Sequence, residues 1–125
     1  MTALRLEHVN ITVRDPAAAA KLMDDVFGWK VRWEGPALNG GHTIHVGSAD
    51  HYLALYAPPG GGRTFPKGQP LNHVGVEVDD LDAVEERVRA AGLTPFNHAD
   101  YNPGRRFYFL DQNGIEFEVV SYAKT

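Results

Sequence analysis

Apolar and polar residues alternate in two stretches of the chain, and these stretches resemble each other. Residues 7–15 read EHVNITVRD and residues 72–80 read NHVGVEVDD, so His8 and His73 stand 65 positions apart. Alternation with a period of two is typical of a strand with one buried face. Each strand therefore places its branched apolar residues on one face and its histidine on the other, and the repeat indicates a duplicated module.

A helix-like segment follows each of these strands. PAAAAKLMDDVFG begins after Asp15 as N-cap, and Gly28 ends it. LDAVEERVRAAG begins after Asp80 as N-cap and has its apolar residues on one stripe, with Gly92 as its stop. Short strands bounded by turn residues are predicted at about 30–33, 43–46 and 51–57 in the first half, and at about 94–97, 106–110 and 115–121 in the second.

These elements predict an α+β fold made of two βαβββ modules. The modules span about residues 1–57 and 71–125, and a loop rich in glycine and proline, 58–70, joins them within a single domain. We expect the strands to form a curved mixed sheet. Each apolar strand face must cover its own helix, so both histidines point to the opposite face, where the sheet encloses a cup.

Composition and net charge exclude several kinds of functional site and partner. The chain has 125 residues, a net charge of −4 and no cysteine, which excludes disulfides, thiolate metal sites and cysteine nucleophiles. The negative charge argues against nucleic acid as a partner. No apolar run approaches the length of a membrane span. The first ten residues, MTALRLEHVN, do not resemble a secretory signal, so we expect a cytoplasmic protein.

Strand parity gathers several metal-ligating side chains on one face. His8, His73 and Tyr108 share the polar parity with a glutamate, and parity leaves Glu116 and Glu118 both open. A polar face on a small sheet is costly to bury unless its groups are satisfied, and a metal ion would satisfy these. The predicted cup is therefore centred on a metal. His42 and His45 are interpreted as surface strand residues without a role.

Three stretches resemble the vicinal-oxygen-chelate superfamily, which includes glyoxalase I, bleomycin- and fosfomycin-resistance proteins and type I extradiol dioxygenases. They are LEHVNITVRDPAAAAKLMDDVFGWKV, LNHVGVEVDDLDAVEERVRAAG and DQNGIEFEVV. The resemblance places ligand positions at His8, Ala54, His73 and Glu118. Because alanine cannot ligate, it implies a triad of two histidines and one carboxylate, as in the extradiol dioxygenases. Such a triad suits Fe(II), with Mn(II) or another divalent metal as a substitute.

The extradiol resemblance also implies catalytic residues. HYLALYA at 51–57 implies His51 as acid–base, and NHADYNPGRRFYFLDQNGIEFE implies His98 and Tyr108, although the spacing from His98 is off by about one residue. His51 has the parity opposite to Ala54, so its role needs a bend at the start of that strand, and we expect one.

The implied reaction is extradiol ring cleavage of a catechol-like aromatic substrate with O₂, carried out by a homodimer. Two alternatives stay open: a glyoxalase-type metal-dependent lyase or isomerase, and a non-catalytic drug-binding resistance protein. Ala54 counts against the first alternative, and the ligand set counts against the second.

Overall fold

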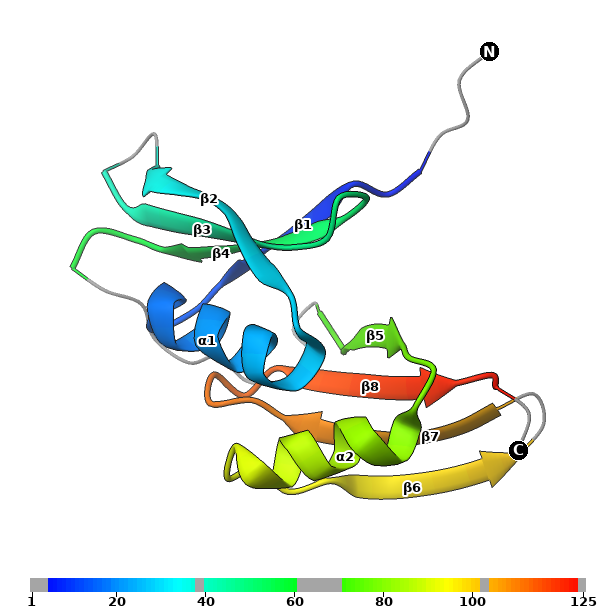
Figure 1. The fold of residues 1–125 in the computed structure, drawn as a ribbon. Coiled ribbons are helices and arrows are strands. Elements are labelled where there is room, and N and C mark those ends of the chain that lie inside the picture. Colours follow the sequence, from blue (N-terminus) through cyan, green and yellow to red (C-terminus); the bar gives the residue numbers. More distant parts are fainter. Residues whose placement is uncertain (1–4, 38–39, 61–70, 102–103, 124–125) are drawn as a thin grey trace, which may run out of the picture. The chain divides into compact units, whose positions relative to one another are not determined.

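The chain forms two compact units, residues 1–64 and 65–125, which we call the first and second units (Figure 1). A computed structural model describes residues 5–37, 40–60, 71–101 and 104–123. The division between the units falls inside the predicted joining loop, of which residues 61–70 lie outside the described residues.

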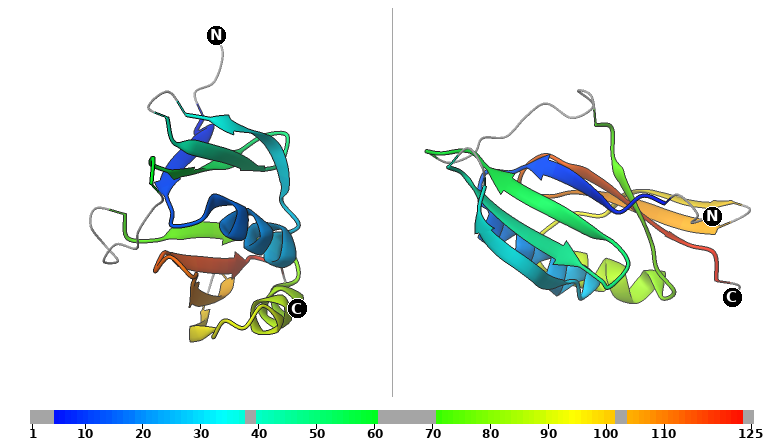
Figure 2. Two further views of the ribbon diagram at one scale, coloured as in Figure 1. Left: turned by 90° about the vertical axis from the view of Figure 1, so that its left-hand side faces the viewer. Right: turned by 90° about the horizontal axis from the view of Figure 1, so that it is seen from above.

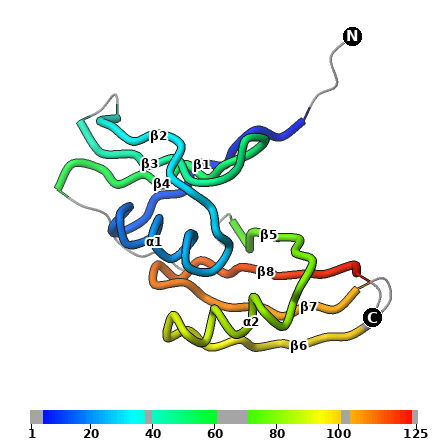
Figure 3. Tube along the Cα trace, in the orientation of Figure 1, coloured from blue at the N-terminus to red at the C-terminus, as the bar shows by residue number. Residues whose placement is uncertain are grey.

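The first unit is a four-stranded mixed sheet with one helix. The strand order is β1-β4-β3-β2; β1 runs parallel to β4, and the other pairs are antiparallel. Figure 3 traces the chain through these strands as a tube coloured from the N-terminus to the C-terminus. The elements are β1 (His8–Thr12), α1 (Pro16–Phe27), β2 (Lys30–Pro36), β3 (His42–Gly47) and β4 (Tyr52–Ala57).

The second unit repeats this topology. Its order is β5-β8-β7-β6, with β5 parallel to β8 and the other pairs antiparallel. The α+β fold of two βαβββ modules is thereby confirmed, with one sheet in each unit. The elements are β5 (Val74–Glu77), α2 (Leu81–Ala90), β6 (Phe96–Tyr101), β7 (Gly104–Leu110) and β8 (Glu116–Ser121).

Both helices begin where the sequence predicts. The Asp15 carboxylate accepts hydrogen bonds from the backbone N–H groups of Ala17 and Ala18, and the Asp80 carboxylate accepts one from Ala83. Gly28 ends α1 in the left-handed conformation, with φ of 71°. In the described part of the chain, neither helix is long and apolar enough to cross a membrane.

Each helix covers one face of the sheet of its own unit (Figure 2). In the first unit, Val13, Val26 and Val46 are completely buried in the layer between helix and sheet. In the second, Phe107 and Phe109 are completely buried. The apolar parity of the strands therefore faces the helices, as predicted, and the polar parity occupies the other face of each sheet.

The turn before β8 is held by a buried carboxylate. Asp111 is 8% exposed, and burial raises the pKa of its carboxyl group. One carboxylate oxygen accepts hydrogen bonds from the backbone N–H groups of Asn113 and Ile115, at 2.8 and 2.9 Å. The other oxygen accepts one from the Asn113 amide, at 3.1 Å.

We expect Asp111→Ala to lower the free energy of unfolding by about 2 kcal/mol, because it leaves buried donors without acceptors. Urea denaturation followed by circular dichroism measures this. Gln112→Ala, at an exposed position of the same turn, is the control and should change stability by less than about 0.5 kcal/mol. Equal effects of the two substitutions would contradict the assignment.

Candidate metal and ligand site

Four rings, one from each strand, cross the polar face of the first sheet. His8 on β1 stacks on Tyr52 of β4 with ring centroids 4.8 Å apart, and Tyr52 stacks on His45 of β3 at 4.5 Å. His45 in turn contacts Trp33 of β2 at 5.0 Å. We call these four side chains the ring row, and the face that carries them the ring face. His45 therefore shares a face with His8, although the sequence pattern predicted no role for it.

A β-bulge in β2 turns two neighbouring residues toward this face. The register with β3 shifts between Val31 and Trp33, so Arg32 and Trp33 both lie opposite His45. The guanidinium carbon of Arg32 lies 4.4 Å from the centroid of the Tyr52 ring, which is a cation–π contact. The ring face thus carries a fixed positive charge beside its aromatic side chains.

The environment of His45 favours its neutral form. Burial is the largest cause that lowers the pKa of His45 below its ordinary value of 6.5, and the positive charges of protonated His8 and of Arg32 lower it further. A neutral imidazole is able to accept a proton from a ligand. The sequence could have indicated the face of His45, because alternation along β3 places Thr43 and His45 on the face opposite to the apolar residues Ile44 and Val46.

In the second unit, the polar face joins a histidine to a carboxylate. The Nε2 atom of His73 lies 3.1 Å from Oε1 of Glu118, and the guanidinium of Arg106 donates a hydrogen bond to Oε2 of Glu118 at 2.8 Å. The side chains of Glu118 and Arg106 are only 15% and 13% exposed. Tyr108 completes this group, with its ring edge-on to His73 at 6.0 Å. Of the two glutamates that parity left open, Glu118 is therefore the one that reaches His73.

The hydrogen bonds of the two repeat-related histidines leave Nε2 available. Nδ1 of His73 lies 2.8 Å from the amide oxygen of Asn72, and Nδ1 of His8 lies 2.9 Å from a carboxylate oxygen of Glu7. Both partners are acceptors, so each Nδ1 carries the proton and, in the neutral ring, Nε2 has the free lone pair.

In the neutral tautomer, Nε2 of His73 and Oε1 of Glu118 are both acceptors. Their 3.1 Å contact therefore needs a proton or a cation between them. Two neighbouring ligands bound to one divalent metal at about 2.1 Å lie about 3.0 Å apart at an octahedral angle and about 3.4 Å apart at a tetrahedral angle. The donor set and spacing of His73 and Glu118 thus fit a divalent metal.

The strand registers of the two units show which positions correspond. Ala54 lies opposite Asn10, two residues after His8, and Glu118 lies opposite Gly75, two residues after His73. Ala54 and Glu118 are thus equivalent.

On the next strand, His45 lies opposite Ala54 and Tyr108 lies opposite Glu118. His45 is therefore the counterpart of Tyr108 in the first unit. Only the second unit has a carboxylate at this position, Glu118. Both units have an aromatic side chain with a polar group on the next strand, His45 in the first and Tyr108 in the second.

His51 lies on the helix side of the first sheet. Its ring meets Trp29, which follows α1, in an edge-to-face contact at 5.5 Å. The β3–β4 register is regular from His42 to Tyr52, so the bend that we expected before this strand is absent. Its ideal parity turns His51 away from the ring face, and the geometry gives no support to its predicted acid–base role.

His98 also lies on the helix side, in the second unit. Its ring stacks on buried Phe107 at 6.0 Å, and its Nε2 lies 3.0 Å from a carboxylate oxygen of Glu85 on α2. The cause is a β-bulge in β6 between Phe96 and Ala99, where Asn97 adopts a φ of 53°. The inserted residue reverses the parity of His98. His98 is thereby separated from Tyr108, which remains on the polar face.

Among the described residues, no group of three or more metal-ligating side chains comes together. The pair of His73 and Glu118 belongs to the second unit and His8 to the first. The complete triad stays a prediction.

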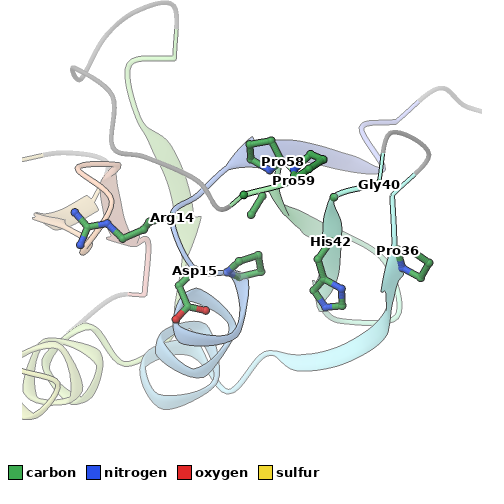
Figure 4. A pocket seen from close by; sticks show the side chains of 11 residues that line it. Arg14, Asp15, Pro36, Gly40, His42, Pro58 and Pro59 are labelled. Carbon is green, nitrogen blue, oxygen red and sulfur yellow. The ribbon is translucent and has the colours of Figure 1, made fainter.

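Two hollows lie at the N-terminal ends of the helices. One, of about 700 Å³, is open and is lined by Asp15, His42 and Pro58 among others (Figure 4). The other, of about 340 Å³, lies at the start of α2 and is lined by Asp80 and Arg105 among others. Neither includes a residue of the ring row or of the group around Glu118.

Comparison with known proteins agrees with this fold. The family model described as Glyoxalase/Bleomycin resistance protein/Dioxygenase superfamily matches residues 5–119. A search of curated proteins finds none that matches the chain.

Several solved structures are similar over nearly the whole chain. A glyoxylase/bleomycin resistance protein/dioxygenase domain from Frankia sp. EAN1pec is 25% identical, with a TM-score of 0.83 and coverage of 96% of this chain and 93% of that one. The fosfomycin resistance protein FosX from Listeria monocytogenes, complexed with Mn(II) and sulfate, is 18% identical, with a TM-score of 0.76 and coverage of 99% and 95%. The antibiotic binding protein TnmS3 from Streptomyces sp. CB03234 is 20% identical, with a TM-score of 0.76 and coverage of 97% and 98%.

We expect His45 to release its proton at a lower pH than an unperturbed histidine. Arg32→Gln should raise the pKa of His45, because it removes one of the positive charges that lower it. An NMR titration of the histidine side chains, with His45→Gln to identify the resonance, measures this. Since the unfolded chain binds this proton more tightly, the contribution of His45 to stability is lost as the pH falls below about 6.5.

Lys21→Gln on α1 is the matched control for Arg32→Gln, because Lys21 pairs with Asp25 on the exposed side of that helix. An equal change in the pKa of His45 in both variants would contradict the influence of Arg32.

Proposed function

Because the chain belongs to the glyoxalase/bleomycin resistance protein/dioxygenase superfamily, we propose that it is a divalent-metal enzyme whose metal is held by His8, His73 and Glu118. The observation that carries the proposal is the contact between His73 and Glu118 at 3.1 Å. The repeat-related position of His8, with its Nδ1 engaged in the same way, supports it as the third ligand. The proposal requires the two polar faces to meet at one ion, within one chain or between the chains of a homodimer.

The reaction that we propose is extradiol-type cleavage of a catechol-like ring with O₂, in which both oxygen atoms enter a ring-opened semialdehyde acid. Two histidines and one carboxylate leave coordination positions free for substrate and O₂, as on a non-haem Fe(II). When bound, Fe(II) would bring the two reactants together and pass electrons between them. Mn(II), the metal of the similar FosX structure, is the second candidate metal.

The side chains of the two faces suit the remaining steps. His45, whose lowered pKa favours the neutral form, accepts a proton at its imidazole nitrogen from a substrate hydroxyl and later returns it. The role that the resemblance gives to His51 thereby goes to the histidine that shares the face of His8. Tyr108 donates its phenolic proton in a hydrogen bond to a substrate oxygen. Arg106 holds Oε2 of Glu118, which leaves Oε1 for the metal.

A glyoxalase-type lyase or isomerase and a non-catalytic binder remain the alternatives. Ala54 is buried and occupies the position equivalent to Glu118, so the first unit offers no carboxylate for a four-ligand site there. The similarity to TnmS3, an antibiotic binding protein, favours the binder as the second candidate.

Removal of one ligand should weaken metal binding by at least about 100-fold, because even outer partners of metal ligands contribute about 10- to 100-fold. We expect this of His8→Ala, His73→Ala and Glu118→Gln, measured as Mn(II) affinity by calorimetry and electron paramagnetic resonance. Glu116→Gln, two residues away on the same strand face, is the control and should bind within a few-fold of wild type. If Glu116→Gln loses as much affinity as Glu118→Gln, the carboxylate ligand is misassigned.

Anaerobic loading with Fe(II), followed by catechols and O₂, should produce a ring-cleaved chromophore with one O₂ consumed per substrate. His45→Gln should lower kcat by about 10²- to 10⁴-fold at unchanged metal content, whereas the matched His51→Gln should leave it unchanged. Metal binding without substrate-dependent O₂ uptake across a catechol panel would exclude the dioxygenase. Loss of turnover in His51→Gln alone would return the acid–base role to His51.

A further inference from the structure

We propose that the ring face of the first unit is a binding subsite for a flat, negatively charged aromatic ring, and that Trp33 is the residue on which this ring stacks. The inference rests on the proposed function for its choice of a catecholate-like ligand, but the subsite itself needs no metal. It names Trp33 and Arg32, neither of which is a predicted metal ligand, as the residues that select the substrate.

The exposed surface of Trp33 is the first argument. This side chain lies at the end of the ring row, in contact with His45, yet the residue is 49% exposed. Tyr52, in contrast, already has a histidine ring stacked on it from each neighbouring strand. Trp33 is the more exposed of the two ends of the row, since the His8 side chain at the other end is 41% exposed, and offset or edge-to-face stacking on such a surface favours a planar ligand.

Two glycines leave room beside residues of the ring row. A Cβ atom added to Gly35 would lie 2.7 Å from Cζ2 of Trp33, so the indole lies over the one residue of its strand that leaves room for it. A Cβ added to Gly47 would lie 2.6 Å from Cα of Tyr52 and would meet the carbonyl oxygen of His51. The position of the Trp33 indole thus depends on a glycine in its own strand, and the close approach of β3 to β4 at Tyr52 depends on Gly47.

Charge on this face favours an anion. The β-bulge in β2 directs Arg32 over Tyr52, and its guanidinium has donors for a phenolate or carboxylate oxygen. The carboxylate at this end of the sheet, Glu7, accepts a hydrogen bond from Nδ1 of His8 and also lies near Arg32 and Tyr52, so it partly offsets the charge of Arg32. His45 is held toward its neutral form, so it contributes a hydrogen-bonding edge without adding charge. A catecholate combines the flat ring and the negative oxygen that these groups suit.

Binding of 4-nitrocatechol to metal-free protein, measured by isothermal titration calorimetry, tests the proposal. We expect measurable affinity in the absence of metal and none for trans-cyclohexane-1,2-diol, which has vicinal oxygens but no aromatic ring. Trp33→Leu should weaken binding about tenfold, which corresponds to about 1.4 kcal/mol, and Arg32→Gln should weaken it for the anion but not for neutral phenol.

The chain contains a matched control, since its second tryptophan, Trp29, lies on the helix side against Phe27 and His51. Trp29→Leu should bind 4-nitrocatechol as the wild type does, and circular dichroism confirms that both variants fold. Equal loss in the two variants, equal binding of the diol, or binding that appears only after metal loading would overturn the proposal. Metal-free binding without any O₂ uptake on Fe(II) loading would uphold the subsite and refute the dioxygenase, so the two failures are distinguishable.

Discussion

The need of each helix to bury its apolar stripe governs the arrangement of the rest. Once α1 and α2 cover one face of their sheets, every strand must present its branched and aromatic core residues to that face, as Val46 and Phe107 do. Alternation then leaves the other face to the polar parity. The histidines, the glutamate and the arginines that carry the candidate chemistry gather there because the hydrophobic layer occupies the opposite side.

Duplication makes the two polar faces comparable position by position. His8 corresponds to His73, Ala54 to Glu118 and His45 to Tyr108 through the same strand pairings. The units differ in what surrounds these positions. The first has a row of stacked rings with a cation, and the second has a partly buried ion pair that orients a carboxylate. One face is therefore suited to hold a ring, and the other is suited to hold a metal.

The similar solved structures share this fold at low identity, and they range from a Mn(II)-complexed resistance protein to an antibiotic binding protein. Fold alone consequently does not select the reaction. The proposal for this chain rests instead on side chains: the methyl group of Ala54, the carboxylate of Glu118 and the imidazole of His45, whose pKa is lowered mainly by burial. Each of these residues can be substituted by itself, so its contribution to the proposed dioxygenase reaction can be measured separately.

The sequence by itself determined the repeat, the helix caps at Asp15 and Asp80, and the face on which His8, His73 and Tyr108 lie, because these depend on local periodicity and local hydrogen bonds. Tertiary structure alone decided the place of His98, whereas strand parity already indicated the faces of His45 and His51. A bulge in β6 reversed the parity of His98, and the regular β3–β4 register kept His51 on the helix side. Parity left Glu116 and Glu118 both open and the resemblance pointed to Glu118, which is the glutamate that contacts His73 in the structure. Bulges and register arise from pairing with a neighbouring strand, and the periodicity of one strand does not determine that pairing.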